Sequence, residues 1–320
     1  MIHAEGLTRH FRVKKQTVEA VRGIDLTVEE GELVAFLGPN GAGKTTTLRM
    51  LTTLLAPTAG QALVAGHDVA KEPDRVRHRI GYVGQGNGAG HSQRVRDELV
   101  TQGRCYGMAS ADAGARADRL LDSLDLAPLA KRTVQTLSGG QRRRLDVAMG
   151  LMHRPPLMFF AEPSTGLDPH NRANLWEHIE RLRAEAGTTI LLTTHYLEEA
   201  DAKAERVIVI DHGSLIADGS SAELKAKLAD DRITVGAADE VAAKQVADVA
   251  ERLAAPGAVT VAGSTVRLRV DRGEVLLPAL VRALDEAGVP PVSVELDHPT
   301  LDDVFLALTG RSLREEDADA

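Results

Sequence analysis

The stretch GPNGAGKT at residues 38–45 decides how the rest of this sequence is interpreted. It follows the apolar run LVAFL (33–37) and precedes the helical stretch TTLRMLTTLL (46–55), so it lies between a buried strand and a helix. Its spacing matches the pattern G-x-x-x-x-G-K-[ST], in which backbone N–H groups close around phosphate oxygens at a helix N-terminus. The binding residues expected here are Gly38, Pro39, Asn40, Gly41, Ala42, Gly43, Lys44, Thr45 and Thr46.

Lys44 and Thr45 supply the chemistry of this loop. The ammonium of Lys44 should reach the β- and γ-phosphates, and the hydroxyl of Thr45 is a ligand for Mg²⁺. A glycine turn without a ligand is the alternative, but the pattern stands in its required setting between a strand and a helix. The sequence therefore predicts that the chain binds a nucleoside triphosphate with Mg²⁺.

The residues around the loop predict an α/β domain over residues 1–228. Short apolar runs alternate there with helical patterns, which is typical of a largely parallel sheet. Between residues 86 and 150 strand signals are absent, and this part is expected to be a helical insert. The expected buried strands are residues 33–37, 157–160, 188–194 and 206–210.

A second, smaller α/β domain is expected over residues 229–310. Its pattern of strands and helices follows the order βαββαβα, which predicts a ferredoxin-like layer. Residues 311–320 are short and charged, and we expect them to be a disordered tail. The sequence of 320 residues is long enough for two such domains.

Charge and hydropathy exclude several classes of function. The net charge of −8 argues against nucleic acid as a partner, because the basic cluster Arg142, Arg143 and Arg144 is too local to reverse it. The apolar runs are strand-sized, far below the roughly 20 residues that span a bilayer. A single cysteine, Cys105, and an N-terminus without an apolar signal segment fit a reducing cytoplasm.

A second glycine turn opens another helix at LSGGQ (137–141). Its residues Ser138, Gly139, Gly140 and Gln141 form a helix N-terminus that is suited to anions. Alone, this turn indicates no more than a capped surface helix.

Together, GPNGAGKT, Gln85, LSGGQ, the segment EPSTGLD (162–168) and His195 resemble, in order and spacing, the ATP-binding cassette (ABC) ATPases. The resemblance covers about residues 1–220 and is strongest to the ATPase subunits of ABC-2 type drug exporters, including the daunorubicin-resistance ATP-binding proteins. It implies a P-loop NTPase cassette with a helical subdomain and ATP as the nucleotide. It also implies a homodimer, in which two subunits pair head to tail.

The resemblance implies a role for each matching residue. The turn at residues 138–141 would contact the γ-phosphate of the partner's ATP, and Asp168 would cross the same interface. Phe11 would stack on adenine, with simple core packing as the alternative. Gln85 would sense Mg²⁺ and water and contact the membrane partner.

Glu162 and His195 each follow a buried strand, at the edge where ligands bind in parallel sheets, and the resemblance implies that both are catalytic residues. By resemblance, Glu162 positions or deprotonates the attacking water, and His195 contacts the γ-phosphate. A structural salt bridge is the alternative for Glu162, and an ordinary core or surface position is the alternative for His195.

Ala161 stands where the family normally carries an aspartate that holds Mg²⁺, usually through water. Loss of an outer-shell metal partner typically costs about 10- to 100-fold, roughly 1.4 to 2.8 kcal/mol. The phosphate loop remains, so we expect ATP binding with slowed turnover.

We expect a peripheral ATPase on the cytoplasmic face of the plasma membrane, which powers an ABC-2 type membrane permease that exports a drug, antibiotic or lipid-like substrate. Because of Ala161, a module that dimerises on ATP with little hydrolysis is the alternative. Soluble cassette proteins of translation or DNA repair are a third reading, but their paired cassettes, coiled-coil arms and zinc cysteines are not found in this sequence.

Overall fold

The computed structural model describes residues 1–14, 16–228 and 230–310. It divides into two compact units, Met1–Gly219 and Ser220–Ala320, and each is described by itself. We expected the first domain to extend to residue 228, but α8 (Ser221–Leu228) packs against α11 (Leu301–Thr309) and so belongs to the second unit. The tail expected at residues 311–320 lies outside the described residues.

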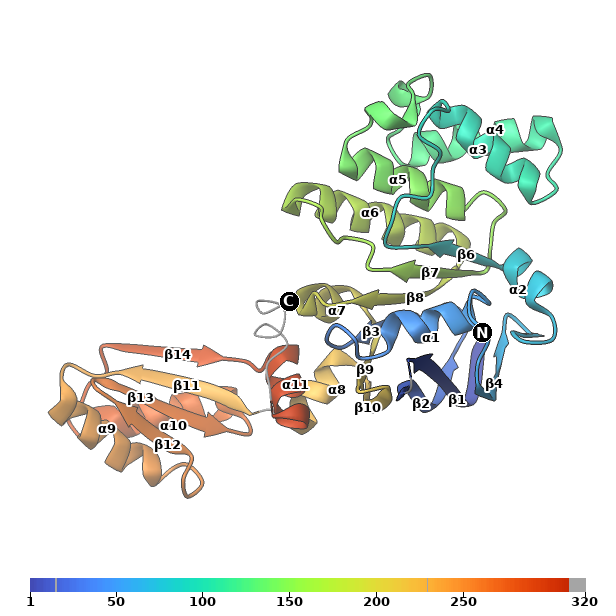
Figure 1. The fold of residues 1–320 in the computed structure, drawn as a ribbon. Coiled ribbons are helices and arrows are strands. Elements are labelled where there is room, and N and C mark those ends of the chain that lie inside the picture. The colour runs from blue at the N-terminus through green and yellow to red at the C-terminus, as the bar shows by residue number, and fades with distance from the viewer. Residues whose placement is uncertain (15, 229, 311–320) are drawn as a thin grey trace. The chain divides into compact units, whose positions relative to one another are not determined.

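A six-stranded sheet forms the centre of the first unit (Figure 1). Its strand order is β10-β9-β3-β8-β7-β6, and all neighbours are parallel except β10, which pairs antiparallel with β9. The expected buried strands are therefore confirmed as neighbours in one largely parallel sheet. The strands are β3 (Leu33–Leu37), β6 (Ile80–Val83), β7 (Leu157–Ala161), β8 (Thr189–Thr194), β9 (Arg206–Asp211) and β10 (Ser214–Gly219).

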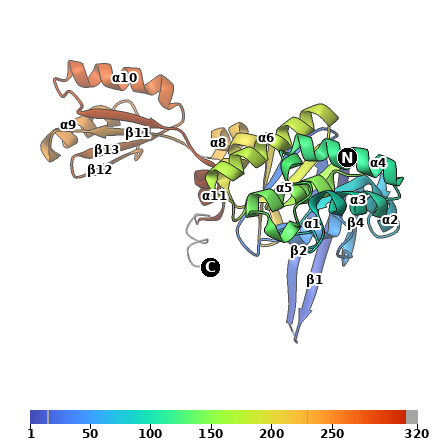
Figure 2. The same ribbon diagram turned by 90° about the horizontal axis from the view of Figure 1, so that it is seen from above.

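A separate antiparallel sheet, which the sequence analysis did not predict, lies at the N-terminal side of the chain. Its order is β2-β1-β4-β5, and Figure 2 shows the β1–β2 hairpin extending as a long ribbon. Register shifts interrupt the pairing of β1 with β2, and they break the alternation of apolar and polar residues that marks a strand. The strands are β1 (Ile2–Val13), β2 (Gln16–Val28), β4 (Ala59–Val64) and β5 (His67–Asp68).

Helix α1 (Lys44–Leu51) lies between the two sheets (Figure 1). Leu48 and Leu51 of this helix are fully buried in one apolar cluster with Phe36 and Phe159 of the central sheet and Ile24 of the antiparallel sheet. Full burial of such a side chain contributes roughly 1.5–3 kcal/mol. The core therefore fixes α1, and with it the preceding loop, against the end of β3.

The helical insert expected between residues 86 and 150 consists of α3 (Val95–Cys105), α4 (Ser110–Ser123), two short 3-10 turns (Ala127–Leu129 and Val134–Thr136) and α5 (Gly139–Gly150). Helix α3 ends at Cys105, because Gly107 adopts a positive φ of 80°. The remaining helices of this unit are α2 (Pro73–Arg79), α6 (Pro169–Ala186) and α7 (Leu197–Lys203).

The second unit contains the expected ferredoxin-like layer. Its sheet has the order β12-β13-β11-β14 with antiparallel neighbours throughout, and α9 and α10 pack on one face. The elements are β11 (Asp231–Gly236), α9 (Glu240–Glu251), β12 (Val259–Ala262), β13 (Thr265–Val270), α10 (Gly273–Glu286) and β14 (Ser293–Asp297).

Within residues 1–14, 16–228 and 230–310, no helix is both long enough and apolar enough to cross a bilayer.

Candidate functional site

The predicted site residues follow neighbouring strands at one edge of the central sheet. In the β7–β8 pair Ala161 lies opposite Thr193, and β3 and β8 end opposite each other. Glu162 follows β7, His195 follows β8, and the phosphate loop follows β3. Parallel pairing therefore brings the loop, His195 and Glu162 to the carboxyl edge, where ligands of open α/β sheets bind. Gln85, two residues after β6, extends this row on the far side of β7.

Close packing around the loop at residues 38–45 explains two of its glycines, Gly38 and Gly43. A Cβ atom on Gly38 would lie 2.1 Å from the carbonyl oxygen of Ile210, and one on Gly43 would lie 2.6 Å from the carbonyl oxygen of Ala20. Gly43 also has a φ of 111°, in the region that favours glycine. The loop is therefore held tightly against β2 and β9, and glycine-rich loops before a helix N-terminus are a common way to bind phosphate.

Lys44 is 4% exposed, and its Nζ donates to the carbonyl oxygens of Gly38 at 2.5 Å and Pro39 at 3.0 Å. Thr45 and Thr46 follow in the first turn of α1 and are half-buried. The first N–H groups of a helix have no intrahelical acceptor, so they and the ammonium converge on this loop. The arrangement fits the phosphates of a nucleotide.

Glu162 has a backbone conformation that is rare for a residue with a side chain. Its φ is 49°, a left-handed value that costs roughly 1–2 kcal/mol outside glycine. Its N–H donates to the carbonyl oxygen of Thr193 at 3.0 Å. Such local strain occurs often at functional sites, and here it lies directly after β7, at the carboxyl edge of the sheet.

The carboxylate of Glu162 lies beside His195, with Oε2 3.6 Å from Nδ1, and it accepts a hydrogen bond of 3.3 Å from the hydroxyl of Thr165. The interaction with His195 lowers the pKa of Glu162, and the charge of Lys44 adds to this effect, whereas partial burial acts in the opposite direction. Glu162 is therefore ionised at neutral pH and can accept a proton.

Ala161 is fully buried, and its methyl group lies in the apolar cluster that also contains Leu48 of α1 and Phe159 of the same strand. Side chains alternate along a strand, so residues 157, 159 and 161 face α1 while residues 158 and 160 face away. The missing carboxylate would thus have pointed toward the helix that carries Thr45.

Comparisons with known proteins agree with this geometry. Residues 21–165 match the family model described as ABC transporter, and residues 219–309 match the model described as ATP-binding protein DrrA1-3-like, C-terminal domain. The daunorubicin resistance ATP-binding protein DrrA3 of Streptomyces coeruleorubidus is 44% identical, over 99% of this chain and 98% of its own length. The chain belongs to the ABC transporter family.

A further relative and a solved structure are also similar to this ABC transporter ATPase. The linearmycin resistance ATP-binding protein LnrL of Bacillus subtilis is 32% identical, over 98% of this chain and 100% of its own length. A dimeric ATP-binding cassette solved with ADP and Pi has a TM-score of 0.64 at 24% identity, over 69% of this chain and 98% of that chain. The resemblance and the cassette fold are confirmed, and the chain is an ATP-binding ATPase coupled to transport.

The signature turn of this ABC ATPase, residues 138–141, forms a capping box at the start of α5. The N–H of Gln141 donates to the hydroxyl of Ser138 at 3.3 Å, and the N–H of Ser138 donates to Oε1 of Gln141 at 3.0 Å. A Cβ atom on Gly140 would lie 2.5 Å from Oδ1 of Asn171, so the turn packs tightly on α6. Asp168 caps α6 by accepting from the N–H of Asn171 at 2.9 Å. The roles of these residues toward a partner stay predictions.

Gln85 and Phe11 are both accessible. Gln85 is exposed in the segment after β6, and Phe11 is half-buried on β1 with the guanidinium of Arg9 4.8 Å from its ring centroid. A partly exposed ring has a free surface, but stacking on adenine stays a prediction. The described residues contain no group of three or more His, Cys, Asp or Glu side chains that could hold a metal ion.

Two charged residues that were not predicted from the sequence pack against the site. Arg143 and Asp146 of α5 are 7% and 6% exposed, whereas the sequence places Arg143 in a run of three arginines that reads as a local basic cluster. The sequence did contain a signal for their burial, because residues 143 and 146 share a helix face with apolar neighbours.

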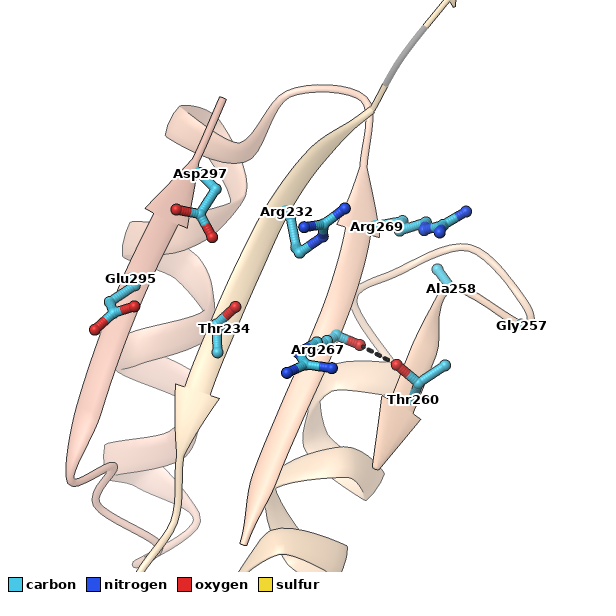
Figure 3. Close-up of a pocket in the computed structure, with 9 residues that line it drawn as sticks. All are labelled: Arg232, Thr234, Gly257, Ala258, Thr260, Arg267, Arg269, Glu295 and Asp297. Carbon is cyan, nitrogen blue, oxygen red and sulfur yellow. Dashed lines mark hydrogen bonds between the residues drawn. The ribbon is translucent and has the colours of Figure 1, made fainter. Parts of the chain in front are cut away.

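A shallow charged pocket lies in the second unit, away from these motifs in the sequence. Figure 3 shows its side chains on the face of the sheet opposite the helices, with Arg232, Arg267 and Arg269 on the two middle strands and Glu295 and Asp297 on β14. It shares no residue with the predicted nucleotide site.

Proposed function

We propose that two copies of this ABC ATPase pair head to tail and power export of a drug or antibiotic through a separate ABC-2 type membrane permease. The relatives at 44% and 32% identity bear names of resistance to daunorubicin and to linearmycin, and they match nearly the full chain. In this proposal the chain works peripherally at the cytoplasmic face of the membrane. The main support for the proposal is the parallel pairing of β3, β8 and β7, which brings the phosphate loop, His195 and Glu162 to one edge of the sheet.

The residues at this edge can perform hydrolysis in defined roles. The phosphate loop and Lys44 hold the β- and γ-phosphates, and His195 contacts the γ-phosphate beside Glu162. The ionised Glu162 orients the attacking water and accepts its proton as the bond between the γ-phosphorus and the β,γ-bridging oxygen breaks. Bound Mg²⁺, with Thr45 and Gln85 as protein ligands, would neutralise charge on the phosphates.

One observation favours a second candidate, an ATP-dependent dimerising module with little hydrolysis. The methyl group of Ala161 is fully buried on the side of the sheet that faces α1, where the family has a carboxylate. The loop and Lys44 would still bind ATP, so the two candidates differ in turnover and agree in nucleotide binding.

Export is tested in cells that express the chain with the membrane protein encoded by a neighbouring gene. Accumulation of a fluorescent anthracycline is measured for the natural chain and for Glu162→Gln. We expect lower accumulation with the natural chain only. Equal accumulation in both strains, with both proteins present at the membrane, would contradict transport of this class of compound.

Turnover is measured on the purified chain as phosphate release, together with the mass of the protein in ATP. Phosphate release that Glu162→Gln abolishes supports the motor, and ATP-dependent dimers without phosphate release support the binding module.

A further inference from the structure

Arg143 of α5 forms hydrogen bonds to two segments at the carboxyl edge of the central sheet, which we call the catalytic edge. Its Nε donates to the carbonyl oxygen of Pro163 at 2.7 Å, and Nη1 donates to that of Gly84 at 2.5 Å. Its Nη2 donates to the carbonyl oxygens of Ala161 and Glu162, both at 3.2 Å. One buried guanidinium thus binds the backbone on both sides of Glu162 and directly before Gln85.

Asp146, one helical turn further along α5, binds the other side of the segment that contains Gln85. Its Oδ1 accepts a hydrogen bond of 2.9 Å from the N–H of Gly88. Burial raises the pKa of Asp146 and lowers the pKa of Arg143, and the opposite charges of the two residues counteract both effects. The two side chains therefore bind backbone groups on either side of Gln85, at Gly84 and Gly88.

Burying the charges of Arg143 and Asp146 costs free energy. The hydrogen bonds that these side chains form therefore indicate their function. A buried ion pair is often no more stabilising than apolar residues of the same size. The four hydrogen bonds of Arg143 described above all go to backbone oxygens of other segments, and one of these oxygens belongs to the left-handed residue Glu162. With the N–H of Glu162 bound to Thr193, both peptide groups of this strained residue are held in place.

We propose that Arg143 and Asp146 are positioning residues for ATP hydrolysis, which fix the backbone of Glu162 and of the segment at residues 84–88 relative to each other. The proposal rests on the proposed role of Glu162 as the group that orients water. A planar guanidinium reaches four carbonyl oxygens in different directions, whereas a lysine at position 143 would keep the charge and lose this geometry.

The test is Arg143→Lys, with Arg144→Lys as the matched control. Arg144 is the next residue of the same helix and is half-buried, but its Nη1 donates to the carbonyl oxygen of Leu124 in the helical insert. Misplacement of reacting groups by about 1 Å costs about 100-fold, so we expect kcat to fall about 10- to 100-fold in Arg143→Lys. The ATP dissociation constant should remain within about twofold in both variants, since the phosphate loop is unchanged.

Two substitutions of Asp146 distinguish a positioning role of its side chain from a general effect on folding. Asp146→Asn keeps an oxygen that can accept from Gly88, whereas Asp146→Ala removes it. We expect kcat to be higher in Asp146→Asn than in Asp146→Ala. Equal losses in the two variants would contradict the role of this hydrogen bond.

Hydrogen–deuterium exchange provides a readout that does not require turnover. In Asp146→Ala, a peptide that covers residues 84–90 should exchange about tenfold faster than in the natural chain, while a peptide from α3 is unchanged. In Arg143→Lys, peptides over residues 84–90 and 160–165 should both exchange faster. Unchanged exchange in both variants would overturn the proposal.

Glu162→Gln, measured alongside, separates this inference from the proposed function. If Glu162→Gln loses turnover while Arg143→Lys keeps the natural kcat, the positioning role is wrong and the role of Glu162 stands. If Glu162→Gln keeps the natural turnover, the proposed role of Glu162 fails, and exchange still reports whether the two side chains hold the backbone.

Discussion

Ala161→Asp restores a carboxylate at the end of β7 and should raise ATP turnover. The side chain at position 161 faces α1, so the new carboxylate would point toward the helix that begins at Lys44 and contains Thr45. Outer-shell metal partners are typically worth about 10- to 100-fold. Because 1.36 kcal/mol corresponds to tenfold, the transition state should gain roughly 1.4–2.8 kcal/mol.

The same substitution should lower stability when no nucleotide is bound. Position 161 is 0% exposed and packs in the apolar cluster, so a carboxyl group there loses hydration without gaining a metal ion. Burial of a polar group without a partner costs about 1–3 kcal/mol in proteins. We therefore expect a lower Tm for Ala161→Asp than for the natural chain, and a larger increase of Tm on addition of Mg²⁺ and ATP.

The assay is phosphate release over a series of Mg²⁺ concentrations, with Tm measured on the same samples. Ala161→Asn is the control, because it has nearly the shape of aspartate without the charge. We expect the rate to rise at least several-fold in Ala161→Asp only, with half-maximal activity at a lower Mg²⁺ concentration. An unchanged rate and an unchanged Mg²⁺ dependence would refute the reasoning, since another group would then already support the metal.

Three further predictions follow from contacts at the same edge. Gly43→Ala should lower the free energy of unfolding by about 1–3 kcal/mol and weaken ATP binding, because its Cβ would meet a backbone oxygen at 2.6 Å. Gly41→Ala, with a positive φ but open space around the new atom, should cost less in the same melting experiment; equal losses would contradict the packing explanation. In His195→Ala the pKa of Glu162 should rise, because the largest influence that lowers it is removed while burial remains. The acid limb of the rate should then move to higher pH, and a pH–rate profile with an unmoved acid limb would argue against this pairing.

The central sheet and the phosphate loop could be predicted because their signals are local. Residues 33–37 and 157–160 are continuous apolar runs of strand length, and such runs mark strands that are buried on both faces. The loop pattern fixes both the strand before it and the helix after it. From these positions, the edge at which Glu162 and His195 meet follows from parallel pairing alone.

Other features depend on contacts between distant segments, and the sequence does not display them. The antiparallel sheet escaped prediction because bulges interrupt the alternation along β1. Arg143 and Arg144 are adjacent arginines, yet one binds the catalytic edge and the other binds the helical insert. Only the packing of α5 against β6 and β7 distinguishes them, and this packing involves residues about 20 and 60 positions away in the chain.

The pairing of two subunits around ATP is tested most directly by the molar mass of Glu162→Gln in solution. This variant should retain the phosphate loop and lose turnover, so bound ATP persists during the measurement. With Mg²⁺ and saturating ATP, we predict the mass of two chains, and with ADP or without nucleotide the mass of one. The mass of a single chain, found while the protein demonstrably holds ATP, would contradict the account.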